Sequence, residues 1–541
     1  MTELRVCSAL QKIFSDAPAL PAERKTLRLF SGERGSVQLC LRAAEDASLS
    51  VALDTALPCR LYEVKEVPVG LPVYPDAGRC TVLRDTPGDY PDLLVPFCGA
   101  LPVKAGRSYA LWAEVDTRGV PAGAYPLRFT VAEAQARRTV CAEVLIGETP
   151  LPEQTLIHTD WFHSDCLSTY YDAPVFGERW WRIVENYMRN AAEHGVNCIL
   201  TPLFTPPLDT EVGSERPTVQ LTGVKRTAAG AWAFDFTRLT RWMDLAERCG
   251  IRYFEFSHLF TQWGALAAPK VIADTPGGDQ RIFGWETDSL SEDYRGFLRA
   301  LGGALTAFTD ARGCTDRCFV HCSDEPGAEH LERYEKCAGL VHTAFGAYRH
   351  IDALSDFAYY ETGLVPVPVP SENSIAPFVG RVPSLWTYYC CGQFRDEMPN
   401  RFIAFPSIRN RILGALLYRY GCDGFLHWGY NFWYTQLSRA RIDPFAVTDA
   451  GKAFPAGDAF CVYPGENGEP LSSLRQKVFA DGLQDLRALR AAEKKLGAAA
   501  VRALVADTLG GIGFSRYPMD EETFFRFRDA LWAAVNGPAA G

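Results

Sequence analysis

Two adjacent carboxylates end the apolar run CFVHCSDEP, residues 318–326. The run is typical of a buried strand, and Asp324 and Glu325 come at its end, where removing a charge from water costs free energy. Carboxyl groups kept in such a place can transfer a proton or orient a polarised group, so we expect both residues to be catalytic. A helix N-cap and a buried salt bridge are the structural alternatives for this pair.

Aromatic, histidine and amide side chains follow the other apolar runs in the same part of the chain. An indole can stack on the apolar C–H face of a pyranose, while polar side chains bind its hydroxyl groups. We therefore predict a sugar-binding cleft. The substrate-binding candidates are His258, Trp263, Trp386, Tyr388, His427, Trp428, Asn431 and Trp433.

Each candidate also has a structural alternative. His258 and His427 could be hydrogen-bonded histidines of the core. Trp386 and Tyr388, two residues apart on one strand, share a face that either lines the cleft or fills the core. The segment HTDWFHSDCLS, residues 158–168, adds polar groups, but the sequence does not indicate which of its histidines contacts a sugar.

The elements that would position these residues alternate between apolar strands and amphipathic helices from Thr155 onward. Strand-like runs such as VNCILTPLF and RYFEFSHLF are separated by helical stripes, one of which runs from Trp180 to Ala191 and ends at Gly195. Repeated units of this kind predict a (β/α)8 TIM-like barrel over residues 151–500. The carboxyl ends of barrel strands meet at one face, which would gather the candidate residues.

Two further segments flank the predicted barrel, so the expected fold class is α/β with additions at both ends. Residues 1–150 contain β-rich runs separated by Gly, Pro and Asp turns, which predict an N-terminal all-β sandwich. A structural role is favoured for it, and sugar binding is the alternative. Residues 501–541 predict a C-terminal helical segment that packs on the barrel.

Composition and charge limit the possible partners. The chain has 541 residues, 55 of them Lys or Arg and 65 Asp or Glu, which gives a net charge of −10. Because nucleic acid and anionic membranes attract basic surfaces, the expected partner is a small molecule or an oligosaccharide. The 17 cysteines form no paired CxxC spacing and no glycine-rich phosphate loop follows a strand, so we expect neither metal nor cofactor. Without a basic leader followed by an apolar run, the protein is predicted to be cytoplasmic.

Five blocks of the chain resemble, in order, those of glycoside hydrolase family 123 and its relatives: SHLFTQWGA, CSDEP, LWTYYCCG, NRILGALLYRYGCDGFLHWGYNFW and LRQKVFADGLQDLRAL. The resemblance covers roughly residues 155–495. It implies exo-acting, retaining removal of terminal β-linked N-acetylgalactosamine, assisted by the 2-acetamido group of the substrate. By this resemblance Glu325 would protonate the leaving oxygen. Asp324 would orient the acetamido group while its carbonyl oxygen attacks the anomeric carbon to form an oxazolinium ion.

This chemistry leads to three structural expectations. Adjacent strand residues face opposite sides, so the backbone must leave β geometry for both acids to reach one ligand. Glu325 should hold a proton, whereas hydrogen bonds should keep Asp324 ionised. The acetamido group should lie between Asp324 and the pair Trp386 and Tyr388. An acid pair at the opposite end of the barrel, or one sealed by an arginine, would exclude the assignment.

Two other functions stay open. One is a glycosidase that acts on β-linked N-acetylglucosamine or on a non-acetylated sugar, in the latter case with an ordinary carboxylate nucleophile such as Glu255, Asp356 or Glu361. The other is a carbohydrate-binding protein without catalytic activity. The natural glycan, its linkage and the oligomeric state are not predicted.

Overall fold

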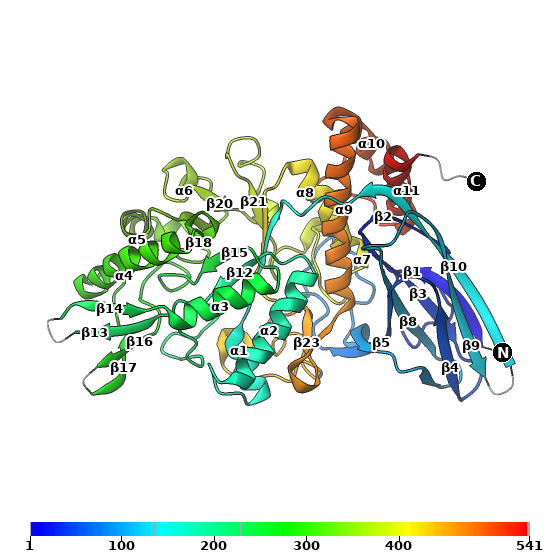
Figure 1. Ribbon diagram of the computed structural model, residues 1–541, viewed down its shortest axis with the longest axis horizontal. Coiled ribbons are helices and arrows are strands. Elements are labelled where there is room, and N and C mark those ends of the chain that lie inside the picture. The colour runs from blue at the N-terminus through cyan, green and yellow to red at the C-terminus, as the bar shows by residue number, and fades with distance from the viewer. Residues whose placement is uncertain (1, 134–135, 228–229, 276, 538–541) are drawn as a thin grey trace.

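The computed structural model describes residues 2–133, 136–227, 230–275 and 277–537. A sheet-rich N-terminal region lies on one side of the molecule, and a larger region of strands and helices lies on the other (Figure 1). The long helix α9 (Leu474–Leu496) runs between them. The sheet-rich region expected from the β-rich runs of the sequence is therefore present.

Two five-stranded sheets make up the N-terminal region, in the orders β1-β3-β8-β5-β6 and β2-β10-β9-β4-β7. Alternate residues of both sheets, such as Leu39 of the first and Val144 of the second, share one buried core. The strands are β1 (Glu3–Ser8), β2 (Thr26–Ser31), β3 (Arg34–Arg42), β4 (Ala47–Asp54), β5 (Cys59–Val69), β6 (Gly88–Pro96), β7 (Ala100–Val103), β8 (Ser108–Asp116), β9 (Gly123–Glu133) and β10 (Ala136–Pro150).

Eight parallel strands form a nearly closed barrel that is consistent with a TIM-like barrel. Their order around the sheet follows the chain, and the first strand pairs with the last, Ile157 opposite Gly424. The gap between the sixth and seventh strands is bridged by Ser371 and Tyr388. The strands are β11 (Ile157–Asp160), β12 (Cys198–Thr201), β15 (Tyr253–Phe256), β18 (Cys318–Val320), β19 (Arg349–Ala353), β20 (Val367–Val369), β21 (Trp386–Tyr388) and β22 (Gly424–His427).

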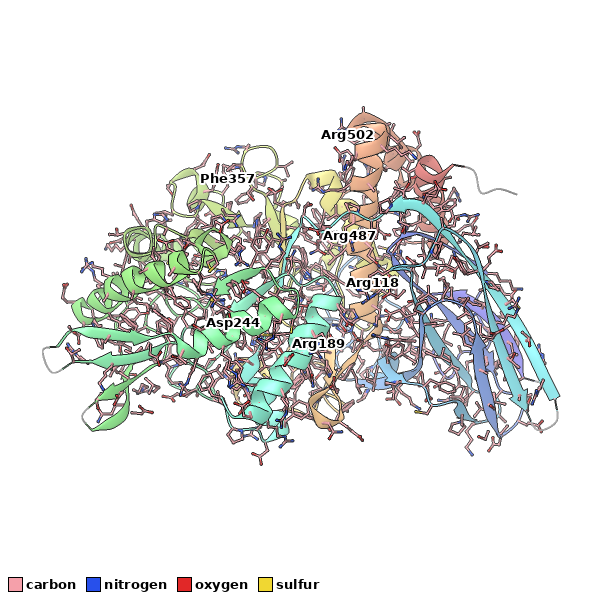
Figure 2. The ribbon with its side chains drawn as sticks, in the orientation of Figure 1. Arg118, Arg189, Asp244, Phe357, Arg487 and Arg502 are labelled. Atoms are coloured by element: carbon pink, nitrogen blue, oxygen red, sulfur yellow. The ribbon has the colours of Figure 1, made fainter. Side chains whose placement is uncertain are left out.

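Helices between these strands bury one face and expose the other. The stripe on α2 is buried from Trp180 to Ala191, as its spacing predicts, while Arg189 on α2 and Asp244 on α3 lie on outer faces (Figure 2). The helices of this region are α1 (Ser164–Tyr171), α2 (Glu178–Glu193), α3 (Thr237–Arg248), α4 (Glu292–Ala311), α5 (Leu331–Ala344), α6 (Ala358–Glu361), α7 (Ser407–Arg411) and α8 (Leu413–Tyr420).

The barrel departs from regular alternation in two places. A four-stranded sheet, in the order β14-β13-β16-β17, is inserted around α3, and its strands are β13 (Gly223–Arg226), β14 (Trp232–Asp235), β16 (Val271–Thr275) and β17 (Gly278–Phe283). Between β20 and β21 the described residues 370–385 contain a 3-10 turn at Glu372–Ser374 but no α-helix. The sixth and seventh strands are therefore joined by a loop in place of a helix.

The C-terminal helices hold the two regions together. After the hairpin of β23 (Val462–Pro464) and β24 (Pro470–Ser472), α9 packs against α8 on one side and β6 on the other. The last helices are α10 (Ala498–Leu509) and α11 (Glu521–Asn536), and α11 also packs against β2 and β10 of the N-terminal region. None of the described helices is long and apolar enough to span a membrane.

Candidate active site

The acid pair lies just beyond the end of β18. The strand stops at Val320, and Glu325 has a backbone φ of +44°, in the left-handed region that non-glycine residues seldom occupy. This turn brings Asp324 and Glu325 to one pocket, so the expected departure from β geometry is confirmed. The Glu325 amide donates to the Ala353 carbonyl at 3.1 Å, and the Trp263 amide donates to the Asp324 carbonyl at 3.0 Å, which fixes the turn.

The pocket beside the pair has a volume of about 240 Å³ and opens at the carboxyl ends of the barrel strands. Five sequence-predicted residues line it, and they are Trp263, Asp324, Glu325, Tyr388 and Trp428. The other lining residues are Trp161, Leu208, Asp209, Gln262, Ala353, Cys390, Cys391, Leu426, Gln436 and Phe454. The described lining residues include no arginine, and the pair is not at the opposite end of the barrel, so neither condition that would exclude the assignment applies.

Glu325 is open to the pocket on one side and surrounded by protein on the others. Burial against the pocket wall raises the pKa of its carboxyl, a hydrogen bond from Tyr388 opposes this rise, and the charge of Asp458 adds to it. The Tyr388 hydroxyl donates to Glu325 Oε1 at 2.5 Å. The net pKa is above the ordinary value for a glutamate, which is the direction that a general acid requires.

The environment of Asp324 differs from the prediction. No described side chain or amide donates a hydrogen bond to its carboxylate, so the hydrogen bonds expected to keep Asp324 ionised are absent from the described part of the protein. Burial and the neighbouring Glu325 carboxylate raise the pKa of Asp324 well above its usual range. The two acids titrate as a coupled pair, and burial disfavours the loss of a proton from either of them.

A buried histidine joins two carboxylates beneath the pocket. His321 Nε2 lies 2.5 Å from Glu255 Oε1, and His321 Nδ1 lies 3.0 Å from Asp352 Oδ1. Burial opposes a charge on His321, but the two carboxylates outweigh burial and raise the pKa of His321 to about 9. A charged imidazolium therefore links β15 and β19 to the residue that follows β18.

His258 stacks on this imidazolium, with ring centroids 4.2 Å apart and ring planes at 22°. Burial and then the charge of His321 lower the pKa of His258 well below its usual value, so its ring is neutral. His258, His321 and Asp352 have ligand atoms close enough to consider a metal ion. Stacked rings, however, direct their nitrogen lone pairs in parallel, and both His321 nitrogens already contact carboxylates. The cluster therefore suits an ion-pair network better than a metal centre.

A second buried network supports Trp428 on the pocket wall. Trp428 Nε1 donates to Asp458 Oδ2 at 2.9 Å, and His427 Nε2 lies 3.6 Å from Asp458 Oδ1. The Arg401 guanidinium donates to His427 Nδ1 at 2.7 Å and pairs with Asp160 at 2.6 Å. His427 and Asp160 therefore support the aromatic wall without lining the pocket.

Several substrate-binding candidates lie outside the pocket, which corrects the prediction for them. Trp386 is two residues before Tyr388 and deeper in the barrel, where Gly424 leaves space for its ring. Trp386 therefore does not line the pocket in which the acetamido group is expected to lie beside Tyr388. The complete set outside the pocket is His258, Trp386, His427, Asn431 and Trp433.

Asn431 and Trp433 have structural contacts in place of the predicted sugar contacts. Asn431 Oδ1 accepts from the His163 amide at 2.8 Å, and Asn431 Nδ2 donates to the His163 carbonyl at 3.1 Å. Trp433 is buried against Tyr187, with ring centroids 5.8 Å apart. The Asn431 contacts hold the loop after β22 against the loop after β11, and Trp433 packs the same loop against α2.

Asp209 is the acidic pocket residue that the sequence reading missed. It lies in a loop after β12, has a φ of +40°, and carries a carboxyl whose pKa burial raises to about 6. Its surroundings in the sequence, TPPLDTEVGS, show neither strand nor helix periodicity. A loop residue of this kind gives no local signal that it reaches the barrel rim.

The candidate nucleophiles for the alternative mechanism do not line the pocket. Glu255 is fully buried and accepts from Thr159 at 2.5 Å and from Trp161 at 2.7 Å, in addition to its contact with His321. Asp356 accepts a hydrogen bond from the Ala358 amide just before α6, and Glu361 pairs with an arginine at the surface. A carboxylate nucleophile would therefore have to be one of the residues that do line the pocket.

An acid pair among aromatic side chains, set at the rim of a parallel barrel, is the arrangement of an enzyme that cleaves glycosidic bonds. The glycoside hydrolase 123 catalytic domain matches residues 161–492, which is more than half of the chain. The chain thus belongs to glycoside hydrolase family 123 and is a glycosidase.

The fold is similar to that of a family 123 glycoside hydrolase from Clostridium perfringens, whose structure was described for glycolipid glycan hydrolysis. The TM-score is 0.77 at 12% identity, over 99% of this chain and 98% of that one. The β-glucuronidase of Parabacteroides merdae gives a TM-score of only 0.32 at 10% identity, over 88% of this chain and 54% of its own, which supports no conclusion. None of the curated proteins compared with the chain matches it.

Proposed function

We propose that the protein is an exo-acting, retaining β-N-acetylgalactosaminidase that uses the 2-acetamido group of its substrate as the nucleophile. The observation that supports this best is the turn at Glu325, which brings two neighbouring carboxyls to one side of one pocket. Two acids on the same side of a sugar ring can serve the leaving group and the acetamido group together. They cannot flank the ring as a separate acid and nucleophile.

In this mechanism the Glu325 carboxyl gives its proton to the glycosidic oxygen as the bond to the anomeric carbon breaks. Asp324 accepts a hydrogen bond from the acetamido N–H, which strengthens the attack of the acetamido oxygen on the same carbon. The products of this step are the free leaving alcohol and an oxazolinium ion. Water then adds to the anomeric carbon and gives a proton to the Glu325 carboxylate, so the enzyme returns to its starting state.

Tyr388 and the aromatic wall have defined parts in the proposal. The Tyr388 hydroxyl hydrogen-bonds Glu325 and fixes the direction of its carboxyl. Trp428, held through Asp458, and the half-exposed Trp263 offer indole faces to the sugar. The domain assignment belongs to the same proposal: a TIM-like barrel over residues 151–500, a structural sandwich over residues 1–150 and a C-terminal helical segment over residues 501–541.

Hydrolysis of 4-nitrophenyl glycosides tests the function. We expect release of 4-nitrophenol from the β-N-acetylgalactosaminide, slower release from the β-N-acetylglucosaminide and none from the β-galactoside. Inhibition by a thiazoline that mimics the oxazolinium ion would support the neighbouring-group step. Hydrolysis of the β-galactoside at a comparable rate would contradict it, because that sugar has no acetamido group.

Asp209 supplies the competing mechanism, because it is a further carboxylate on the wall of the same pocket. If Asp209 were a covalent nucleophile, a 2-deoxy-2-fluoro glycoside with a good leaving group would label it, and peptide mass spectrometry would locate the label. We expect no label on Asp209.

A further inference from the structure

The candidate active site is acidic and has no cationic side chain on its wall. Its ionisable carboxyls are Asp209, Asp324 and Glu325, and the described residues that line it include no lysine, arginine or histidine. Asp458 lies behind the wall and also raises the pKa of Glu325. A ligand that enters the pocket therefore meets carboxyl groups from several directions, and the charge of Asp209 is present above its raised pKa of about 6.

The arginines whose charges lower the pKa of Asp209, Arg216 and Arg439, are already paired with other carboxylates. Arg216 makes a buried bidentate contact with Asp165, at 2.6 and 2.8 Å. Arg439 contacts Glu211 at 2.9 Å. Because each guanidinium already has a carboxylate partner, an anionic group on the sugar would find no counterion without breaking one of these pairs.

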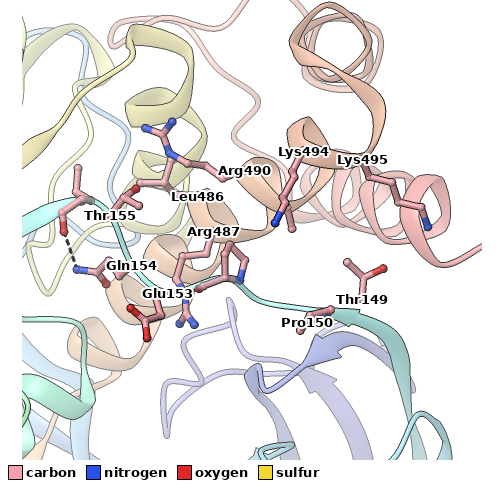
Figure 3. Close-up of a pocket in the computed structure, with 13 residues that line it drawn as sticks. Thr149, Pro150, Glu153, Gln154, Thr155, Leu486, Arg487, Arg490, Lys494 and Lys495 are labelled. Atoms are coloured by element: carbon pink, nitrogen blue, oxygen red, sulfur yellow. Dashed lines mark hydrogen bonds between the residues drawn. The ribbon is translucent and has the colours of Figure 1, made fainter.

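Clustered positive charge occurs elsewhere, in a cleft of about 470 Å³ between α9 and the segment 149–156 that enters the barrel. Figure 3 shows Arg487, Arg490 and Lys494 projecting from α9 around this cleft. The segment leads into the amino end of β11, so the cleft lies away from the carboxyl ends of the strands where the pocket opens. The basic side chains of α9 therefore do not neutralise the pocket.

Asp209 is held so that part of its carboxylate can bind a sugar. Its Oδ2 accepts from the Leu437 amide at 3.0 Å, its own amide donates to Gln262 Oε1 at 2.7 Å, and its carbonyl accepts from Ser438 at 2.7 Å. These contacts hold the strained backbone at φ +40°. Within the described part of the chain, Asp209 Oδ1 has no protein donor, so it can accept from a ligand hydroxyl.

We infer that the pocket selects uncharged terminal sugars and rejects sugars that carry a sulfate ester or a carboxylate, and that Asp209 is a main determinant of this choice. The inference rests on the proposed function and names its substrate class. Asp209 accepts a hydrogen bond from a hydroxyl of the neutral sugar, and the same carboxylate repels a sulfate placed at that hydroxyl.

The test compares the aryl β-N-acetylgalactosaminide with its 4-O-sulfate and 6-O-sulfate. We expect kcat/KM to be at least about 100-fold lower for one or both sulfated substrates, because like charges brought together cost several kcal/mol. In Asp209→Asn we expect the ratio of kcat/KM for the neutral substrate to kcat/KM for the sulfated substrates to fall by about 10-fold. For the neutral substrate, KM should rise while kcat stays within about threefold, the pattern of lost binding rather than lost chemistry.

Two variants control for folding and for general charge effects. Asp209→Glu keeps the charge, so it should keep the rejection of sulfate while weakening neutral-sugar binding. Glu361→Gln removes a surface carboxylate outside the pocket and should leave the ratio unchanged. Thermal unfolding of each variant shows whether a lost activity reflects a lost fold.

Calorimetry with free N-acetylgalactosamine and its 6-sulfate separates this inference from the proposed function, because binding needs no turnover. One outcome is that the neutral sugar binds, its sulfate does not bind, and no aryl glycoside is hydrolysed. This result would contradict the proposed function but support the inferred selectivity for uncharged sugars. If the sulfated sugars bind or react as well as the neutral one, the selectivity is overturned even where hydrolysis occurs. If the ratio of kcat/KM for neutral and sulfated substrates were unchanged in Asp209→Asn, Asp209 would not determine the selectivity.

Discussion

At the scale of single residues, the Tyr388 hydroxyl contacts only one of the two neighbouring carboxyls in the pocket. That contact orients Glu325, whereas Asp324 faces the pocket without a protein donor among the described residues and is ready to accept one from a ligand. The sequence could show that both acids end a strand, because the apolar run before them is continuous. It could not show their partners, because these partners come from β21 and from loops far away in the chain.

Leaving-group dependence should separate the two acids. In Glu325→Gln we expect kcat to fall by about 10²–10⁴-fold for a sugar or alkyl leaving group and much less for 2,4-dinitrophenol, which departs without a proton. Asp324→Asn should lower kcat for both kinds of leaving group alike, because Asp324 serves the acetamido group. Rates across a series of aryl glycosides measure this difference, and equal losses for Glu325→Gln across the series would exclude it as the acid.

The pH dependence of kcat/KM should report the hydrogen bond from Tyr388. This bond favours the carboxylate of Glu325, so its removal in Tyr388→Phe raises the pKa of Glu325 further. Because activity needs the protonated acid, the alkaline limb of the profile should move to higher pH, by roughly 0.5–1 unit for a bond of ordinary strength. Tyr360→Phe, which removes a hydroxyl outside the pocket, is the control. If the alkaline limb of Tyr388→Phe stayed in place or moved to lower pH, the assignment of this limb to the titration of Glu325 would be contradicted.

At the scale of elements, the sequence predicts the barrel strands and the buried helix faces well, because each has its own hydrophobic period. The stripe from Trp180 to Ala191 on α2 is an example. The inserted sheet was not predicted, since β13 pairs with β16, almost fifty residues later, through Lys225 and Asp274. Local sequence patterns do not indicate which distant strands pair with each other. The same reason explains why Trp386 could not be assigned to the core from its position on β21 alone.

The imidazolium between β15 and β19 should make stability depend on pH. The pKa of His321 rises from an unfolded value near 6.5 to about 9 in the folded protein. The stabilisation that the charged His321 gives the folded protein is therefore complete below about pH 6.5 and is lost as the pH rises through about 9. We expect the wild-type free energy of unfolding in urea to fall by about 3 kcal/mol over this range, relative to His321→Gln.

The His321→Gln variant also tests the network at a single pH. At pH 6.5 it leaves Glu255 and Asp352 without their shared cation, so we expect a loss of about 3–5 kcal/mol. Titrating groups that do not interact with His321 act equally in both proteins and cancel in the comparison. Parallel stability curves for the two proteins from pH 6 to pH 10 would show that His321 is not charged in the folded state.

At the scale of the whole molecule, the N-terminal sheets are linked to the pocket through buried contacts. Asp92 on β6 pairs with Arg475 on α9 at 2.9 Å, and both side chains are inaccessible to solvent. The same guanidinium donates to the Gly457 carbonyl at 2.6 Å and to the Phe460 carbonyl at 2.9 Å. Between these two residues lies Asp458, which holds Trp428 on the pocket wall.

Asp92→Asn should therefore affect both stability and substrate binding. Removing one partner of a buried ion pair costs about 3–5 kcal/mol, because Arg475 is left without a matching charge. Arg475 would then no longer hold the loop of Asp458 firmly, so KM for the aryl glycoside should rise while kcat changes little. Glu114→Gln is the matched control, because Glu114 pairs with Lys477 on the same helix but Lys477 does not contact that loop. We expect the control to lose stability with KM unchanged. If Asp92→Asn left KM unchanged as well, the N-terminal sheets would support the barrel without influencing the pocket.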